Sequence, residues 1–194
     1  MFRPPPLRIE IVGEFLKIAL LWIFVRRALL IALACALLFA PGWTADRSSR
    51  PAVEQADRIV IVKSARTMTL LRQGKVLKTY KVALGQQPRG RKVQAGDNRT
   101  PEGEYTIDLR NAHSQFHLSL RISYPNPADR ERAKKLGVDP GGAIMIHGLP
   151  AAYAWLGPAH RQTDWTLGCI AVTNPEIEEI WKMVPLGTKV EIKP

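Results

Sequence analysis

The hydrophobic and polar positions of this chain follow the period of β-strands over most of its length. Short runs of alternating or β-branched residues recur at 58–63, 68–71, 76–84, 105–109 and 116–123. Alternation with a period of two is typical of a strand that has one side in solvent. Three shorter apolar or alternating runs follow at 143–146, 169–173 and 188–192. The pattern therefore predicts a mainly β domain, folded as a sandwich or a small barrel.

Helix signals occur at two places. Residues 128–136 are charged and are followed by Gly137, a residue that commonly ends helices. Asn174 is predicted to cap a second helix, with Pro175 at its first position and acidic residues in its first turns. We therefore expect two or more short helices beside the strands.

Glycines and prolines interrupt residues 85–103 too often for a regular element. A loop of this length within a compact domain is usually functional. The loop also contains a dense basic stretch, residues 89–92 (RGRK), and a second one lies at residues 130–135. Both stretches are interpreted as solvated basic surface.

The N-terminal region differs from the rest of the chain. Residues 28–40 (ALLIALACALLFA) contain no polar side chain except that of Cys35, and Arg26 and Arg27 precede them. A basic segment before a short apolar run is typical of a signal peptide or an N-terminal membrane anchor. We assign residues 1–45 to this segment, residues 46–57 to a linker and residues 58–194 to a catalytic domain. The domain is then exported to the periplasm or cell envelope, with membrane contact only through its N-terminal segment.

Composition and charge narrow the function classes. The chain is 46% hydrophobic and 23% charged, which is ordinary for a globular protein, and its net charge is +11. A basic chain suits nucleic acid or an anionic polymer, but export argues against nucleic acid as a partner. No cluster of cysteine and histidine reaches four ligands, so neither a metal nor a cofactor is expected. His113 and His117 lie in strand-like sequence, and His160 is expected to be solvated.

Cys169 is the one cysteine outside the N-terminal segment. It therefore has no partner for an internal disulfide, and three interpretations remain: a buried apolar residue, an intermolecular disulfide or a reactive nucleophile. His147 follows another buried strand, and a nearby imidazole activates a thiol by taking its proton. Gly168 allows close approach of a carbonyl group, and the amides of residues 167–169 are candidates for an oxyanion hole.

Several motifs resemble one known family. Residues 146–148 (IHG), residues 166–170 (TLGCI) and residues 96–105 (GDNRTPEGEY) are similar to segments of the L,D-transpeptidase catalytic (YkuD) family of bacterial cell-wall enzymes. Residues 124–126 (YPN), 140–142 (PGG) and 164–166 (DWT) resemble its YafK-like subgroup. The resemblance covers residues 58–194 and implies the family's β-sandwich or barrel fold.

The resemblance also implies roles for single residues. Cys169 corresponds to the nucleophile and His147 to the general base, and the residues that shape the site or its oxyanion hole are Gly168, Leu167, Thr166 and Gly148. Leu167 stands where most members have a histidine, and Ala171 stands where many have arginine or asparagine. The side chains then left to bind substrate carboxylates are Arg99, Asp164 and Asn174.

The implied function is a cysteine acyltransferase that acts on peptidoglycan stem peptides. A thioester forms at meso-diaminopimelate with loss of D-alanine, and an amine then opens it. One alternative is a hydrolase of the same fold that cuts stem-peptide links or links between peptidoglycan and protein, with a wall-anchored lipoprotein as partner. The second alternative is an inactive wall-binding module.

Overall fold

The computed structural model describes residues 53–194. The predicted signal peptide or anchor at residues 1–45 lies outside the described residues, as does most of the predicted linker. Within the described part of the chain, the helices are too short or too polar to cross a membrane.

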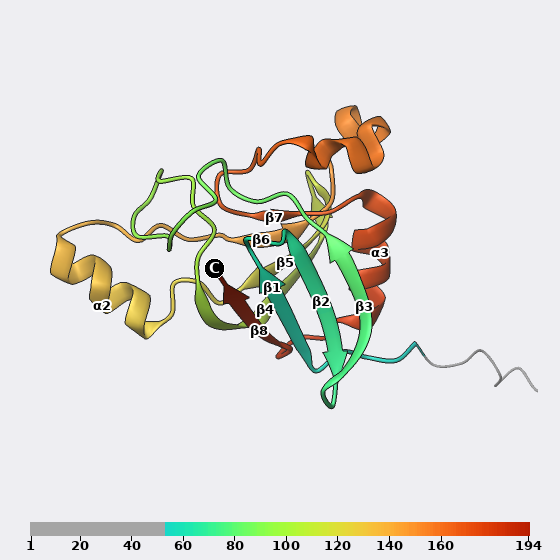
Figure 1. Cartoon of the computed structure of the whole chain (residues 1–194), viewed down its shortest axis with the longest axis horizontal. Coiled ribbons are helices and arrows are strands. Elements are labelled where there is room, and N and C mark those ends of the chain that lie inside the picture. The colour runs from blue at the N-terminus through green and yellow to red at the C-terminus, as the bar shows by residue number, and fades with distance from the viewer. Residues whose placement is uncertain (1–52) are drawn as a thin grey trace, which may run out of the picture. The chain divides into compact units, whose positions relative to one another are not determined.

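Eight strands form one curled sheet, in the order β3-β2-β1-β8-β4-β5-β6-β7 (Figure 1). Their bounds are β1 Arg58–Val62, β2 Thr67–Arg72, β3 Lys75–Lys81, β4 Gly103–Ser114, β5 His117–Ile122, β6 Met145–His147, β7 Ile170–Ala171 and β8 Lys189–Lys193. The parallel pairs are β1 with β8 and β6 with β7. The expectation of a mainly β fold is confirmed.

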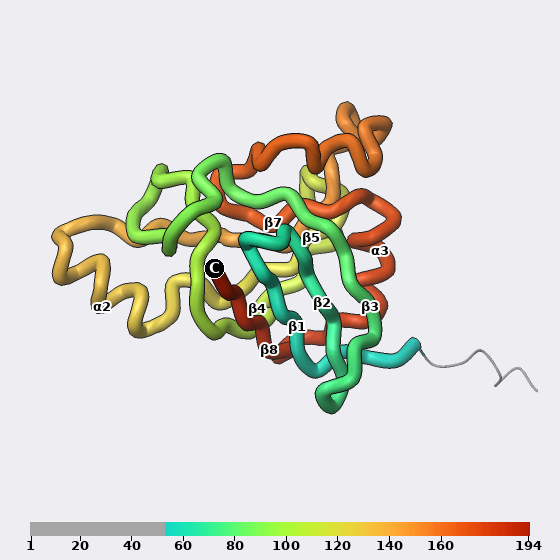
Figure 2. The backbone as a smooth tube through the Cα atoms, viewed as in Figure 1, coloured from blue at the N-terminus to red at the C-terminus, as the bar shows by residue number. Residues whose placement is uncertain are grey.

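The long strand β4 joins the two halves of the sheet. Its first residues, Gly103 to Thr106, pair with β8, and its later residues pair with β5. The register shifts between Ile107 and Leu109, an irregularity of the kind that bends a strand. The sheet curls, and β5 lies behind β1 and β2 in Figure 2.

Three helical segments lie around the sheet: α2 (Pro127–Leu136), the 3-10 segment η1 (Ala151–Gln162) and α3 (Asn174–Met183). The side chain of Asn126 caps α2, and Gly137 ends it in the left-handed conformation with φ of 68°. Helix α2 extends from one end of the molecule, whereas α3 packs against β5 (Figure 1). The two α-helices confirm the expectation from the sequence, which gave no signal for η1.

Alternating residues of the strands fill the core. Ile59 and Ile61 of β1 are fully buried, and the pattern repeats with Met68 and Leu70 of β2. Helix α3 adds three side chains from one face, those of Ile177, Ile180 and Met183. Burying each such side chain contributes roughly 1.5–3 kcal/mol. The core therefore holds α3 on the sheet.

The start of α3 differs from the prediction in one residue. Thr173, rather than Asn174, is the N-cap. The carboxylate of Glu176 accepts hydrogen bonds from the amide and the hydroxyl of Thr173, at 2.9 and 2.8 Å. Asn174 does not cap the helix because its side chain accepts a hydrogen bond from the amide of Leu149, as described below.

The predicted strand at 76–84 also ends earlier than expected, because β3 stops at Lys81. Val82, Ala83 and Leu84 are buried but leave β2. Ala83 exchanges two backbone hydrogen bonds with Ala171 of β7, at 3.0 and 2.9 Å. The loop that begins here is thereby placed against the segment that contains Cys169.

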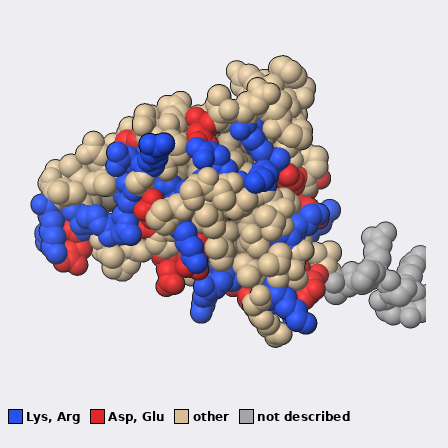
Figure 3. Space-filling model, viewed as in Figure 1, with Lys and Arg blue, Asp and Glu red and all other residues tan. Residues whose placement is uncertain are grey.

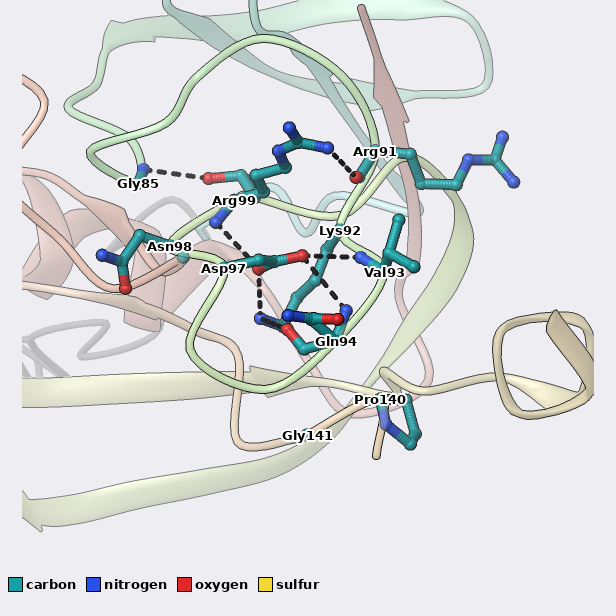
Figure 4. Close-up of polar contacts among 12 residues, drawn as sticks. Gly85, Arg91, Lys92, Val93, Gln94, Asp97, Asn98, Arg99, Pro140 and Gly141 are labelled. Atoms are coloured by element: carbon teal, nitrogen blue, oxygen red, sulfur yellow. Dashed lines mark hydrogen bonds and ion pairs between the residues drawn. The ribbon is translucent and has the colours of Figure 1, made fainter. Parts of the chain in front are cut away.

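Lysine and arginine side chains lie at several places on the face seen in Figure 3, with acidic side chains beside them. Among the described residues, ion pairs include Arg58 with Glu191 and Lys78 with Glu179. Lys92 is an exception to the predicted solvated surface, because only 4% of it is exposed. The prediction is wrong for this residue because an internal carboxylate, that of Asp97, binds its ammonium group (Figure 4).

Candidate active site

Two neighbouring parallel strands bring the predicted catalytic residues together. In the register of β6 and β7, Ile146 is opposite Ile170 and His147 is opposite Ala171. Cys169 immediately precedes β7, so it lies beside Met145. Since alternate residues of a strand share a face, Met145 and His147 project to one side of β6 and Ile146 to the other. Cys169 and His147 therefore share one face of the sheet, two residue positions apart along adjacent strands.

Both residues line one cleft of about 460 Å³. The cleft also contains two residues predicted to shape the site, Thr166 and Leu167, and the Leu167 side chain is exposed at its rim. The remaining lining residues come mainly from β4, β5 and the turn between them: Asn111, His113, Ser114, Gln115, Phe116 and Ser119, together with Met145 and Trp165.

The imidazole of His147 is held in one tautomer. Its Nδ1 lies 2.7 Å from the carbonyl oxygen of Gly148. A carbonyl only accepts hydrogen bonds, so Nδ1 carries the proton and Nε2 of the neutral ring is free to take another. The rings of Phe116 and Trp165 flank the imidazole, with centroids at 4.5 and 5.8 Å. Burial lowers the pKa of His147, although its bond to Gly148 opposes the shift.

The sulfur of Cys169 has two polar neighbours, both of them backbone groups. Sγ accepts a hydrogen bond from the amide of Met145 at 3.4 Å and lies 3.8 Å from the carbonyl oxygen of Ala143. Burial raises the pKa of the thiol, while the Met145 amide and the charge of Lys92 lower it in part. The surroundings therefore include two groups that favour the thiolate and one effect that disfavours it.

Thr166 braces the turn that carries the cysteine. Its hydroxyl donates to the carbonyl of Cys169 at 2.7 Å and accepts from the amide of Gly168 at 3.1 Å. Gly168 has φ of 128°, a value that side chains with Cβ rarely adopt, and a Cβ there would lie 2.7 Å from the carbonyl oxygen of Arg99. Glycine at this position thus meets both a backbone and a packing requirement.

The other three candidate residues do not line the cleft in the described part of the chain. Asp164 accepts from the amide of Leu84 at 3.0 Å and pairs with Arg66 at 2.7 Å. Arg99 directs its guanidinium toward the carbonyl of Arg91, at 3.5 Å. Asp164 thus joins the start of the loop after β3 to the segment that precedes Cys169, whereas the Arg99 contact lies within that loop.

Asn174 also acts within the fold. Its Oδ1 accepts from the amide of Leu149 at 2.6 Å. Gly148 lies beneath this contact, and a Cβ on Gly148 would lie 2.5 Å from Asn174 Oδ1. Asn174 and Gly148 therefore fix the backbone immediately after His147.

Sequence reasoning missed the aromatic side chains around the imidazole. Phe116 was part of a predicted strand and Trp165 of a motif, and neither carried a signal for contact with His147. His160 is 5% exposed, not solvated as predicted, because it is the buried residue of η1 and its ring packs edge-on against Trp165. Its Nδ1 accepts from Trp165 Nε1 at 3.3 Å. Burial and the charge of Arg161 lower the pKa of His160 to about 4.

Among residues 53–194, no group of three or more histidine, cysteine, aspartate or glutamate side chains is arranged to hold a metal ion. His117 instead lies 2.7 Å from Glu178, and His113 lies at the cleft. The titratable groups that line the cleft are the thiol of Cys169 and the imidazoles of His147 and His113.

This combination of curled sheet, strand-end cysteine and strand-end histidine defines a class. Residues 56–192 match the model of the L,D-transpeptidase catalytic domain, which is most of the chain. The chain belongs to the L,D-transpeptidase catalytic domain family, whose members take part in peptidoglycan remodelling.

Individual relatives agree with this membership. The chain is 29% identical over 132 residues to YafK of Escherichia coli (strain K12), covering 65% of this chain and 46% of YafK. It is 25% identical over 158 residues to YqjB of Bacillus subtilis (strain 168), covering 80% of each. The names of both relatives assign them to the L,D-transpeptidases. The chain thus spans less than half of the length of YafK.

Solved structures show the same fold. The helical cell shape determining protein Pgp2 from Campylobacter jejuni superposes with a TM-score of 0.55 at 24% identity, covering 73% of this chain and 49% of that one. Bd1075 of Bdellovibrio bacteriovorus superposes with a TM-score of 0.50 at 21% identity, covering 73% and 51%.

Proposed function

We propose that this protein is a cysteine acyltransferase that acts on the stem peptides of peptidoglycan, with Cys169 as nucleophile and His147 as general base. The observation that carries the proposal is the placement of both side chains on the neighbouring strands β6 and β7 or immediately beside them, in one cleft. Membership of the L,D-transpeptidase family supplies the substrate class.

In the first half of the reaction, His147 takes the thiol proton of Cys169. The sulfur then attacks the carbonyl carbon of meso-diaminopimelate, the third residue of a tetrapeptide stem. The carbon–sulfur bond forms and the bond to the nitrogen of D-alanine breaks, and the imidazolium returns its proton to that leaving amine. Backbone amides of residues 167–169 are the candidates to stabilise the oxyanion.

In the second half, an amine of a second stem attacks the thioester. Nε2 of His147 takes the proton of the attacking amine and passes it to the sulfur, which leaves as the thiol. The hydrogen bond from Nδ1 to the Gly148 carbonyl leaves Nε2 of the neutral ring without a proton. Nε2 is therefore able to accept a proton in each half of the reaction. The result is a cross-link between two stems.

Water competes with the amine for the acyl group of the thioester. The share of hydrolysis depends on how well the acceptor side of the cleft excludes water. Leu167 is 70% exposed at the rim, where it offers an apolar surface but no hydrogen-bonding group. A hydrolase that releases D-alanine or cuts a peptidoglycan–protein link is therefore the second candidate.

The test is mass spectrometry of the full chain incubated with disaccharide-tetrapeptide muropeptides. We expect cross-linked dimers that have lost D-alanine, and no product from Cys169→Ala. Cys35→Ala is the matched control, because it removes the other cysteine and should leave turnover unchanged. Tripeptides without dimers would establish the hydrolase instead. Intact substrate with the wild-type chain, together with retained binding to sacculi, would overturn catalysis in favour of a wall-binding module.

The proposed substrate also predicts where in the cell the protein acts. Peptidoglycan lies outside the cytoplasmic membrane, and Arg26 and Arg27 before residues 28–40 support export of the domain. We assign residues 58–194 to the exported catalytic domain. Fractionation of cells that express the full chain should find it in the periplasm or envelope, and replacing Arg26 and Arg27 by glutamate should retain it inside.

A further inference from the structure

Two aromatic side chains separate the cleft from a second hollow. This hollow has a volume of about 500 Å³ and is lined mainly by the 3-10 segment η1 and the residues at its two ends. Phe116 and Trp165 line both hollows, whereas the candidate catalytic residues line only the cleft. The two rings are therefore the boundary between the reacting groups and the space beside η1.

The indole of Trp165 contacts the imidazole of His147 edge-on. The ring centroids are 5.8 Å apart and the ring planes are 70° apart. Phe116 completes the group, since its ring lies 4.5 Å from that of His147 and stacks on that of Trp165 at 6.4 Å. Aromatic rings at such distances attract one another in preferred relative orientations. The orientation of the indole therefore affects the orientation of the imidazole.

One hydrogen bond fixes the indole. Nε1 of Trp165 donates to Nδ1 of His160 at 3.3 Å, and an indole has no other polar atom. His160 is 5% exposed, and its Nε2 is buried without a partner among residues 53–194. Burying an imidazole costs free energy unless hydrogen bonds compensate for it. The bond to Trp165 is thus what a histidine supplies at this position and an apolar side chain would not.

The acceptor for the indole is itself anchored to the core. Arg161, the residue after His160, forms an ion pair with Glu176 of α3. The same carboxylate accepts from the amide of Thr173, where α3 begins. Since the buried face of α3 holds this helix on the sheet, the end of η1 that contains His160 is attached to a fixed part of the molecule.

The hollow beside η1 explains why the indole needs this bond. Protein interiors are close-packed, and neighbouring atoms normally hold a side chain in its rotamer. Trp165 instead borders the cleft and the hollow of about 500 Å³. Packing alone therefore does not prevent the indole from turning away from the imidazole, whereas the bond from its Nε1 to His160 does.

We propose that Trp165 is a positioning residue for His147 and that His160 keeps Trp165 in place. The bond from Nδ1 of His147 to the Gly148 carbonyl fixes one edge of the imidazole. The indole limits rotation of the ring, so that Nε2 stays available to the thiol of Cys169. The inference rests on the proposed role of His147 as general base, and neither Trp165 nor His160 exchanges a proton with the substrate.

The first experiment is steady-state turnover of disaccharide-tetrapeptide muropeptides by the full chain. His160→Leu should lower kcat about threefold to tenfold, the effect of losing one hydrogen bond, with KM changed less than about twofold. His160→Asn should restore most of kcat, because its Oδ1 offers an acceptor near the position of Nδ1. The matched control is Trp155→Phe, which removes an exposed indole of η1 whose Nε1 donates to the Ala152 carbonyl, and it should equal wild type.

Trp165→Phe tests whether both residues act through the same bond. It keeps an aromatic ring but removes the donor, so it should lower kcat by about the same factor as His160→Leu. In the Trp165→Phe background, His160→Leu should have no further effect, because the bond is already absent. Losses that multiply in the double variant would overturn the proposal. A raised KM with unchanged kcat, or equal losses in His160→Asn and His160→Leu, would overturn it as well.

A measurement without peptidoglycan separates this proposal from the proposed function. The rate at which iodoacetamide alkylates Cys169 near neutral pH reports how well His147 ionises the thiol. Mass spectrometry of the peptide that contains Cys169 keeps Cys35 out of the readout. His160→Leu and Trp165→Phe should react more slowly than wild type and Trp155→Phe.

The two possible failures give different results. A wild-type chain that leaves muropeptides intact, but whose alkylation slows in His160→Leu and Trp165→Phe, would refute the transpeptidase activity and retain the positioning role. A wild-type chain that turns over muropeptides, with kcat and alkylation rates unchanged in both variants, would do the reverse.

Discussion

The hydroxyl of Thr166 donates a hydrogen bond to the carbonyl oxygen of Cys169 at 2.7 Å, and the same oxygen atom of Thr166 accepts from the amide of Gly168. One side chain therefore closes the turn from both ends. Because Thr166 is only 4% exposed, water does not replace these bonds easily when the hydroxyl is removed.

Thr166→Val should lower the free energy of unfolding by about 1–3 kcal/mol, the cost of leaving buried polar groups without partners. It should also slow acylation of Cys169 at least tenfold, because the turn no longer fixes the sulfur. Thr166→Ser keeps the hydroxyl and should retain most of both properties. Urea denaturation and thioester formation measure the two effects, and equal behaviour of the valine and serine variants would refute this role.

Gly168→Ala should be among the most damaging single changes near the site. The added Cβ would lie 2.7 Å from the Arg99 carbonyl and 3.1 Å from Ile144 Cδ1, at φ of 128°. Backbone strain alone costs about 1–3 kcal/mol. Gly142→Ala is the control, since a Cβ there has no atom within 4 Å. Thermal denaturation should separate the two, and a Gly168→Ala protein as stable and active as wild type would contradict this packing.

Asp164 should contribute more to the free energy of unfolding through its hydrogen bond from the Leu84 amide than through its ion pair with Arg66. The Arg66 side chain is 42% exposed, so solvent screens the ion pair and Arg66→Ala should cost less than about 1 kcal/mol. Asp164→Ala also leaves the buried Leu84 amide without its acceptor and should cost about 1–3 kcal/mol. Asp164→Asn retains an acceptor and should resemble Arg66→Ala. Chemical denaturation of the three variants gives the order, and equal losses would show that the ion pair dominates.

The stability of the protein should fall as the pH drops from about 6.5 toward 4. In the folded state the pKa of His160 is lowered to about 4, mainly by burial, whereas in the unfolded chain it is near 6.5. The unfolded state therefore binds more protons in this range, and stability rises with pH there. Protonation also removes the acceptor for Trp165 Nε1. Burial shifts His147 in the same direction.

Urea midpoints at pH 7, 5.5 and 4.5 measure this dependence. His160→Phe should flatten it in part, since His147 remains, while exposed His113→Gln should leave it as in wild type. A His160→Phe protein that loses stability with acid as steeply as wild type would show that His160 is not the titrating group.

Much of the fold was predictable from local sequence signals. Alternation placed β1, β2 and β5 within one residue at each end, and Gly137 marked the end of α2, but β4 extends to Ser114, beyond the predicted end at residue 109. Local signals were insufficient where two adjacent residues are both able to cap the same helix. Thr173 and Asn174 are both good helix caps, and the contact of Asn174 with Leu149 leaves the cap to Thr173.

The sequence predicted which residues belong to the candidate site, but not which strands bring them together. His147 and Cys169 each follow or precede an apolar strand next to glycine, which the sequence displays. It does not display that β6 and β7 are parallel neighbours, or that residues 83–85 return to pair beside β7. Pairings between distant segments depend on the packing of the whole core, which no local pattern contains.

The sequence by itself determined the strand-rich class, the two α-helices and the identity of the candidate nucleophile and base. Only the tertiary structure decided which charged groups are buried. Lys92 reads as part of a solvated basic run, and its loop folds inward because Asp97 and three backbone amides satisfy one another there. A residue's charge is local, but its exposure and its electrostatic effect depend on what the rest of the chain places around it.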